Sequence, residues 1–388
     1  MSNKLRILIA AAGVCMSAGM AAAGPTCENG VIPVGSISTL TGLVDFSDAP
    51  DAAQATFDQF NAAGGFDGCM IEYFVADDRS DPQVAAQAAR DLLDNREVVA
   101  MAGSASLLEC AVNAVTYERR GLKSIPGVGV DPLCFNAPSV APVNVGPYTL
   151  TTIMLDFAAR ELDAEKVCAF FVIVGGTQEA YAGAVEAWEA SSGQQMGFVD
   201  MTLPLQGDMT PYVIKARNEG CDAVMTNQIY TGVVQWVNTA DAQEISGIDW
   251  VFLAPGYTEG VAEALAGTSQ SVHVGTEWEP FTVDSSANAE WIAAMDAAGL
   301  EKTAFAQGGY MAAQALIDTI SRIDGPVTRE SVTEQLLKGA EFQSPIAGNP
   351  WTFGDKDRHA PMQSTKVVQL DGGTWTVVTD DWYRLAGQ

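Results

Sequence analysis

Residues 103–106, Gly-Ser-Ala-Ser, could hold a polar ligand without any charged side chain. They follow a short apolar run and precede a helical pattern, so they would lie where a strand ends and a helix begins. The hydroxyls of Ser104 and Ser106, with the backbone N–H groups around Ala105, can bind a carboxylate or amide oxygen. Ordinary capping of the helix is the alternative interpretation of the same pattern.

Two more segments could contribute to such a site. Thr41 follows the first predicted strand and Phe46 lies a little further on, so both are candidates to face a ligand; a purely structural loop is the alternative. Gly127 and Gly129 follow the fourth predicted strand, where missing side chains would let the backbone approach a ligand. A plain turn explains these glycines equally well.

Four tyrosines stand at strand ends or just after a predicted connection between domains. A tyrosine offers apolar area together with a hydroxyl, which suits the wall of a small-molecule site. Packing alone is the alternative at each position. These residues are Tyr148, Tyr181, Tyr230 and Tyr257.

Patterns of enzymatic and metal chemistry are missing from the sequence. It has no G-x-S-x-G, no credible Cys-His pair, and its GVGVDP (127–132) lacks the third glycine of a dinucleotide fingerprint. Glycines 64, 65 and 68 precede a strand, whereas a phosphate loop follows one. Asp77 and Asp78 lack the further oxygen ligands that a metal needs. We therefore expect no enzyme activity, no cofactor and no metal.

The N-terminus predicts export. Lys4 and Arg6 precede an apolar stretch, and Ala21-Ala22-Ala23 supply a cleavage site before Gly24, so residues 1–23 are expected to be a signal peptide. The formal net charge is -28, and loss of the two basic residues makes it two units more negative. Without a basic cluster we expect no nucleic-acid partner. We expect a monomer in the periplasm.

Six cysteines remain after cleavage, and an even number in an exported chain favours disulfides. Six cysteines allow 15 connectivities. The predicted strand positions narrow them, because cysteines near the starts of neighbouring strands can meet. We predict the pairs Cys27–Cys69, Cys110–Cys134 and Cys168–Cys221.

The elements that must position these residues alternate between strand and helix patterns, which predicts α/β units and parallel sheets. Strands are predicted at 31–38, 69–76, 98–103 and 122–127, then at 166–174, 198–203, 221–227, 249–255 and 272–276. Helices are predicted at 49–63, from Pro82, and at 287–298, 305–323 and 329–337. Two last strands are joined by a hairpin turn at 371–373. A proline-rich loop at 132–147 separates the two halves.

The ordered set of motifs resembles a known family: the solute-binding proteins of ABC transporters, in the class of the leucine, isoleucine and valine receptors. The motifs that carry the resemblance are VGSISTLTG (34–42), NAAGG with FDG and DDRSDP (61–82), VVAMAGSAS (98–106) and GGYMAAQALIDTI (308–320). They extend over essentially the whole mature chain.

The resemblance implies a type I periplasmic binding protein fold: two Rossmann-like lobes joined by a three-strand hinge. It implies lobe 1 over 24–147, lobe 2 over 148–280, a return to lobe 1 over 281–345, and a return to lobe 2 with the C-terminal strands over 346–388. Ligand would bind between the lobes, at the carboxyl ends of strands, and be enclosed by hinge closure. In the family the position of Ser104 and Ser106 holds the ligand carboxylate, and the positions of Tyr181 and Tyr230 face the ligand.

One departure from the family concerns the ligand. Amino-acid receptors of this class hold the ammonium group with acids in two segments, which read GPYTLTT (146–152) and APGYTEG (254–260) here. The first has no acid, and Glu259 falls a few positions late in the second. A small acid, amide or aromatic compound is therefore expected at least as strongly as a branched-chain amino acid. The expected function is a receptor that delivers its ligand to membrane permease subunits, with ligand sensing for a membrane receptor as the alternative.

Overall fold

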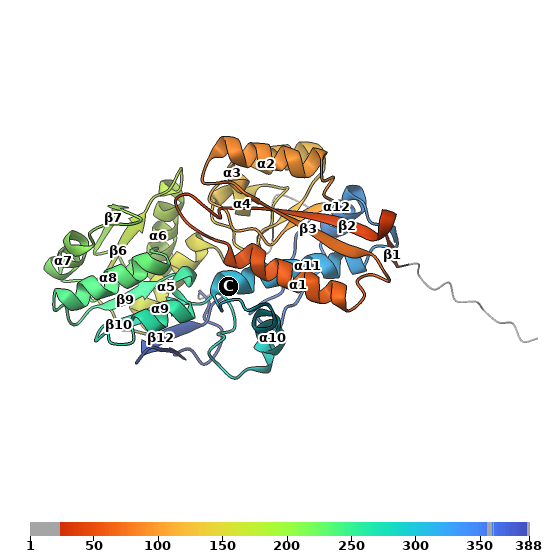
Figure 1. Ribbon diagram of the computed structural model, residues 1–388. Coiled ribbons are helices and arrows are strands. Elements are labelled where there is room, and N and C mark those ends of the chain that lie inside the picture. Colours follow the sequence, from red (N-terminus) through yellow and green to blue (C-terminus); the bar gives the residue numbers. More distant parts are fainter. Residues whose placement is uncertain (1–23, 355–358, 360, 386–388) are drawn as a thin grey trace, which may run out of the picture.

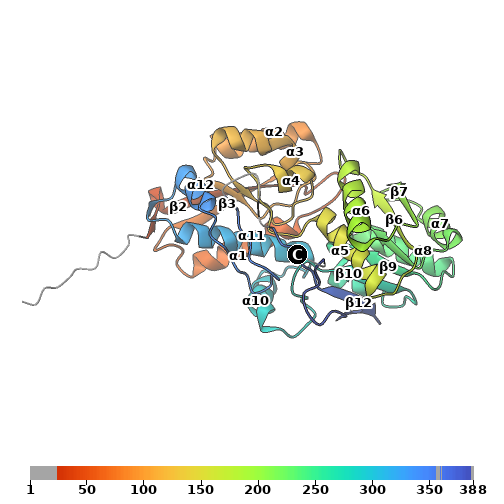
Figure 2. The same cartoon turned by 180° about the vertical axis from the view of Figure 1, so that it is seen from behind.

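The computed structural model describes residues 24–354, 359 and 361–385. Figures 1 and 2 show two α/β lobes side by side, one with β2, β3, α1 and α2 and the other with β6 to β10 and α5 to α9. The predicted signal peptide, residues 1–23, lies outside the described residues. No helix in the described part of the chain has the length and apolar character needed to cross a membrane.

Lobe 1 contains a parallel sheet of four strands in the order β3-β2-β4-β5. The strands are β2 (Val31–Ser38), β3 (Met70–Asp77), β4 (Ala100–Ala102) and β5 (Ser124–Ile125). The helices that connect or follow them are α1 (Asp48–Ala62), α2 (Pro82–Asp94), α3 (Glu109–Arg120) and α4 (Pro132–Asn136). The carboxylate of Asp81 accepts hydrogen bonds from the N–H groups of Gln83 and Val84, so α2 begins at the predicted cap.

Lobe 2 contains a sheet of seven strands in the order β13-β12-β10-β9-β8-β6-β7. Its strands are β6 (Val167–Val172), β7 (Phe198–Leu203), β8 (Ala223–Thr226), β9 (Asp249–Phe252), β10 (Ser271–Gly275), β12 (Val367–Asp371) and β13 (Thr374–Val377). Its helices are α5 (Pro147–Arg160), α6 (Gln178–Ser192), α7 (Thr210–Glu219), α8 (Tyr230–Ala242) and α9 (Glu259–Ala264). Every residue of β6 is buried, because helices cover both faces of the sheet and the strand can be apolar throughout.

The chain returns to lobe 1 after β10. This part contains α10 (Ala289–Ala298), α11 (Ala304–Ser321) and α12 (Arg329–Leu337), and the short strand β11 (Gly325–Pro326) pairs with β1 (Pro25–Thr26). Short 3-10 turns occur at Glu28–Gly30 (η1), Ala254–Gly256 (η2) and Ser286–Asn288 (η3). Helix α11 packs against α1 so closely that a Cβ on Gly309 would lie 1.9 Å from the carbonyl oxygen of Ala49. Only glycine fits at that contact.

The structure agrees with the expected elements at most positions. The strands predicted at 31–38 and 198–203 and the helix at 329–337 have the predicted bounds, and β12 and β13 form the predicted antiparallel hairpin. The lobe limits near residues 147, 280 and 345 stay predictions.

All three predicted disulfides are present. Cys27 pairs with Cys69, Cys110 with Cys134, and Cys168 with Cys221, and the Cα atoms of each pair are 5.9, 5.1 and 6.0 Å apart. Each bond links positions 24 to 53 residues apart in the sequence within one lobe. Such links stabilise a fold by roughly 2 to 5 kcal/mol each, chiefly by restricting the unfolded chain.

Candidate ligand-binding site

A largely apolar cavity lies between the two lobes. The volume of this cavity, measured as the space open to the centre of a water molecule, is about 100 Å³. Much of its lining comes from the segments that follow β2, β4, β5, β6, β7, β8, β9 and β10, that is, from the carboxyl ends of parallel strands in both sheets, and the rest includes residues of α5 and α11. The residues are Val44, Phe46, Leu107, Val128, Gly129, Val130, Asn144, Pro147, Tyr148, Leu150, Val172, Val174, Thr177, Tyr181, Leu205, Asn227, Ile229, Leu253, Ala254, Pro255, Glu277 and Phe305.

Aromatic side chains pack in pairs around this cavity. Phe46 and Phe305 meet edge to face with their ring centres 5.1 Å apart. Tyr148 and Tyr181 do the same at 5.0 Å, and Tyr181 stacks on Phe171 at 4.7 Å. These contacts hold the rings in place, so the wall is formed before any ligand arrives.

Three neutral polar side chains also line the cavity, and two of them are already bonded to the protein. Asn227 accepts from the N–H of Val172 at 2.7 Å and donates to its carbonyl oxygen at 3.0 Å. Asn144 accepts from the N–H of Gly129 at 2.8 Å. The buried hydroxyl of Thr177 has no hydrogen-bonding partner among the described residues.

Glu277 is the one acid that lines the cavity in the described part of the chain. Its side chain is buried, at 3% exposure. Oε1 accepts from the N–H of Gly146 at 2.8 Å and from the amide of Asn144 at 3.3 Å. Burial raises the pKa of this carboxyl to about 7, and the two hydrogen bonds offset only part of that rise.

Four residues predicted from the sequence line the cavity: Phe46, Gly129, Tyr148 and Tyr181. Tyr148 also donates from its hydroxyl to the carbonyl oxygen of Val130 at 2.9 Å. Burial raises the pKa of Tyr181 to about 12, so both tyrosines are neutral hydrogen-bonding groups at physiological pH. Their role in ligand binding remains a prediction.

The serine segment lies outside the cavity lining and is bonded within lobe 1. The hydroxyl of Ser104 donates to Glu109, and that of Ser106 donates to Asp78. The Ser106 hydroxyl also accepts from the N–H of Glu109 at 2.8 Å, and the N–H of Ala105 donates to Ser38 at 3.1 Å. The capping interpretation therefore accounts for the Ser106 hydroxyl.

Thr41 and Gly127 also have contacts other than the cavity. The Thr41 hydroxyl donates to Asp77 at 2.6 Å, which ties the loop after β2 to the end of β3. At Gly127 a Cβ would lie 2.7 Å from the backbone nitrogen of Gly309, so the close approach there is to helix α11.

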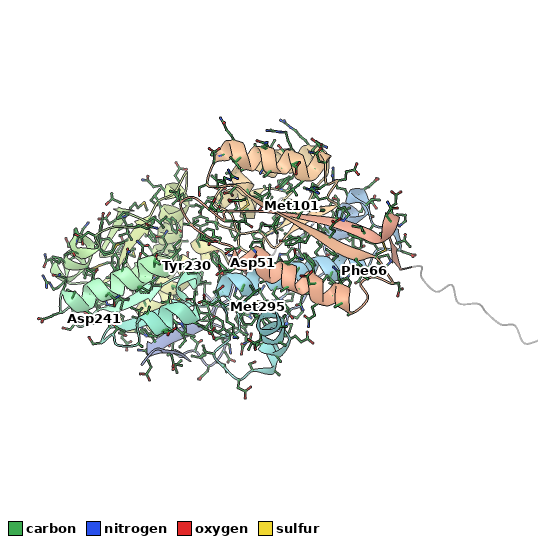
Figure 3. All side chains as sticks on the ribbon, viewed as in Figure 1. Asp51, Phe66, Met101, Tyr230, Asp241 and Met295 are labelled. Atoms are coloured by element: carbon green, nitrogen blue, oxygen red, sulfur yellow. A yellow bond between two sulfur atoms is a disulfide. The ribbon has the colours of Figure 1, made fainter. Side chains whose placement is uncertain are left out.

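The last two predicted tyrosines lie apart from the cavity lining as well. The Tyr257 hydroxyl is 3.2 Å from that of Thr282, and its ring stacks on Phe281 inside the core. The Tyr230 hydroxyl donates to Asp48 at 3.0 Å, which joins α8 of lobe 2 to α1 of lobe 1. Figure 3 shows Tyr230 near the junction of the lobes. Ligand-binding roles stay untested predictions for the seven predicted residues outside the lining, which are Thr41, Ser104, Ala105, Ser106, Gly127, Tyr230 and Tyr257.

Sequence reasoning missed four polar residues of the cavity: Asn144, Thr177, Asn227 and Glu277. Two of them could have been found by the rule that ligands bind at the carboxyl ends of strands. Glu277 directly follows the strand predicted at 272–276, and Asn227 ends the one predicted at 221–227. Attention to the family positions directed the search for an acid toward Glu259.

The described residues contain no group of three or more His, Cys, Asp or Glu side chains placed to hold a metal. Asp77 and Asp78 instead accept hydrogen bonds from the loop after β2, including 3.1 Å from the Thr39 hydroxyl to Asp78. They frame the turn, which is the interpretation that the sequence favoured.

Two α/β lobes with a cavity between them define a solute receptor of the type I binding-protein fold. Residues 31–374 match the periplasmic binding protein family, so the chain belongs to that family. Its members are receptors and not enzymes. A search of curated proteins finds no match.

Solved structures of similar fold cover nearly the whole chain. LivJ of Streptococcus pneumoniae with isoleucine has a TM-score of 0.75 at 17% identity, covering 91% of this chain and 99% of its own. A branched-chain amino acid transporter protein of Thermus thermophilus with valine has 0.78 at 14%, covering 92% and 97%. A solute-binding protein of Rhodopseudomonas palustris with benzoate has 0.74 at 15%, covering 92% and 97%. At these identities the similarity shows the fold.

Proposed function

We propose that the protein is the extracytoplasmic receptor of an ABC importer and that it binds a small, mainly apolar organic molecule in the cavity between its lobes. The observation that carries the proposal is the cavity itself, which is lined from both lobes and mostly apolar. A ligand that touches both lobes stabilises the closed arrangement, because its contacts are complete only when the lobes meet.

The structures of similar fold described above contain different ligands: isoleucine, valine and benzoate. These share a compact apolar body. The apolar lining from Val44, Val172 and Leu253 favours the same kind of body here. The cavity volume of about 100 Å³ is smaller than the apolar cavity of about 150 Å³ that accepts benzene, so the ligand body should be no larger than a single ring or a short branched aliphatic chain.

Binding is tested by thermal denaturation and titration calorimetry with a panel of amines, amino acids, amides and small carboxylates. A ligand at 100 times its dissociation constant adds about 2.7 kcal/mol to the free energy of unfolding. Val130→Trp should abolish binding because it fills the cavity that Val130 lines. Val115→Trp is the matched control, since Val115 is 60% exposed on α3. Equal binding by both variants would contradict the proposed site.

The cellular part of the proposal concerns export and delivery. The chain is exported to the periplasm, cleaved near Ala23-Gly24, and releases its ligand to membrane permease subunits. Mass spectrometry of the exported protein should give a mature chain that begins at Gly24. Stimulation of permease ATPase activity by the liganded receptor, and not by Val130→Trp with the same compound, tests the delivery step.

A further inference from the structure

The described residues donate hydrogen bonds to one of the two carboxylate oxygens of Glu277. Oε1 of Glu277 is bonded to the N–H of Gly146 and to the amide of Asn144, but Oε2 has no partner among the described residues. The side chain is 97% buried and lines the cavity. An ionised carboxylate is costly in a largely buried site without a cation, so a ligand that supplies a positively charged donor gains affinity there.

The surroundings of Glu277 offer no compensating cation. No Lys, Arg or His is found among the described residues that line the cavity, and its other titratable members are Tyr148 and Tyr181. Glu279, two residues further on, pairs with Lys366 at 3.2 Å and does not line the cavity. The N–H of Glu277 itself donates to Thr365, a neutral side chain. The positive partner must therefore come with the ligand.

Among the described residues that line the cavity, a ligand carboxylate would find neutral donors such as the Thr177 hydroxyl but no cation. The N–H of Gly146, where α5 begins, already donates to Glu277. The serine segment that could hold a carboxylate is bonded to Glu109 and Asp78 within lobe 1. A second carboxylate placed beside Glu277 would add like charge to a buried, cation-free space.

We propose that Glu277 binds an ammonium group of the ligand, and that the ligand class is an apolar primary amine that lacks a carboxylate. This inference rests on the proposed function and adds the chemical class of the solute. The amine would make a charge-assisted hydrogen bond to Oε2, and its hydrocarbon body would contact the apolar wall.

The test compares molecules that differ only in the charged group. Calorimetry at pH 8 with 3-methylbutylamine, 3-methylbutanoate and leucine, and with benzylamine and benzoate, separates amine from acid. We expect each amine to bind at least ten times more tightly than its matching acid, and 3-methylbutylamine to bind more tightly than leucine. Tighter binding of the acids or of leucine would overturn the inference.

Glu277→Gln should weaken amine binding at least tenfold while the variant keeps its fold, because glutamine retains an oxygen for the Gly146 N–H. Glu279→Gln is the matched control and should leave amine affinity unchanged. Amine affinity in the wild type should also rise as the pH increases through about 7, where Glu277 ionises. Unchanged amine affinity in Glu277→Gln, or affinity that falls with rising pH, would overturn the inference.

The inference and the proposed function fail in different ways. Absence of binding by all amines overturns the inference alone if another apolar compound binds and Val130→Trp abolishes that binding. If compounds bind equally well to wild type and Val130→Trp, the proposed cavity itself is wrong, and the amine inference falls with it.

Discussion

Two buried glutamates, Glu109 in lobe 1 and Glu277 in the cavity between the lobes, share burial but differ in their partners. They are 1% and 3% exposed, and burial raises the pKa of each to about 7. Glu109 accepts from Ser104 through Oε2, and from Tyr117 at 3.2 Å and Ser124 at 3.1 Å through Oε1. The hydrogen bonds that the described residues give to Glu277 go to Oε1.

This difference distinguishes a buried acid that stabilises the fold from a buried acid that can bind a ligand. A raised pKa follows from burial in both cases and cannot distinguish them. The count of satisfied oxygens can, because a polar atom left without a partner in a stable fold needs a reason. Both oxygens of Glu109 accept hydrogen bonds within lobe 1, whereas the described residues donate to one oxygen of Glu277.

The largest effect is expected when the carboxylate of Glu109, which accepts three buried hydrogen bonds, is removed. Glu109→Leu should lower the free energy of unfolding by about 4 kcal/mol, because three buried hydroxyls lose their acceptor. Glu277→Leu is the matched substitution and should cost less than about 2 kcal/mol, since only two donors lose a partner. Urea denaturation followed by circular dichroism measures both. Equal costs would show that the two acids have the same role.

Removal of the disulfide beside Glu109 tests whether lobe 1 stability is separate from the cavity. The double variant Cys110→Ala and Cys134→Ala should lose about 3 kcal/mol of stability. Ligand affinity should stay within about twofold, because neither cysteine lines the cavity. The same denaturation and calorimetry measure these values, and a large loss of affinity would refute the separation.

The pH dependence of stability sharpens the comparison next. Each carboxyl has a folded pKa of about 7, raised from 4.5, so the folded protein holds the proton more tightly than the unfolded chain. The contribution of each acid to the free energy of unfolding is therefore fully present below pH 4.5, and it is lost as the pH rises through about 7.

The Glu277→Gln variant has no ionisable carboxyl at this position, so it does not show the loss of stability that Glu277 causes as the pH rises. Between pH 5 and 8, its stability relative to wild type should rise by about 2 kcal/mol. Urea midpoints at a series of pH values measure the difference. A bound amine should reduce it, because the ammonium stabilises the ionised carboxylate of the wild type. A difference that does not change with pH would contradict the raised pKa of Glu277.

The smallest effect concerns a contact that joins the lobes. Tyr230→Phe removes the hydrogen bond to Asp48 and should weaken ligand binding about fivefold, since a net hydrogen bond contributes about 1 kcal/mol to the closed form. Tyr212→Phe is the control, because that hydroxyl donates to Thr202 within lobe 2 at 3.1 Å. Calorimetry compares the two. Equal affinity in both variants would show that the contact does not favour closure.

Prediction from the sequence succeeded where the determinants are local. The cap at Asp81, the strand at 31–38 and the hairpin of β12 and β13 follow from patterns of neighbouring residues. Disulfide pairing also followed, because parallel neighbours bring Cys27 near Cys69. The site was found in part: Phe46 and Tyr181 line the cavity, but Ser104 and Ser106 do not.

The sequence by itself determined the α/β elements, the three disulfides and the family, since each depends on residue spacing that the chain carries along its length. Only the tertiary structure decided which polar groups are free. Ser104 and Glu277 both follow a strand in a loop, and nothing local shows that Ser104 donates to Glu109 while the described residues give Oε2 of Glu277 no hydrogen bond. Partners of a buried polar atom come from distant segments, so its satisfaction is a property of the packed fold.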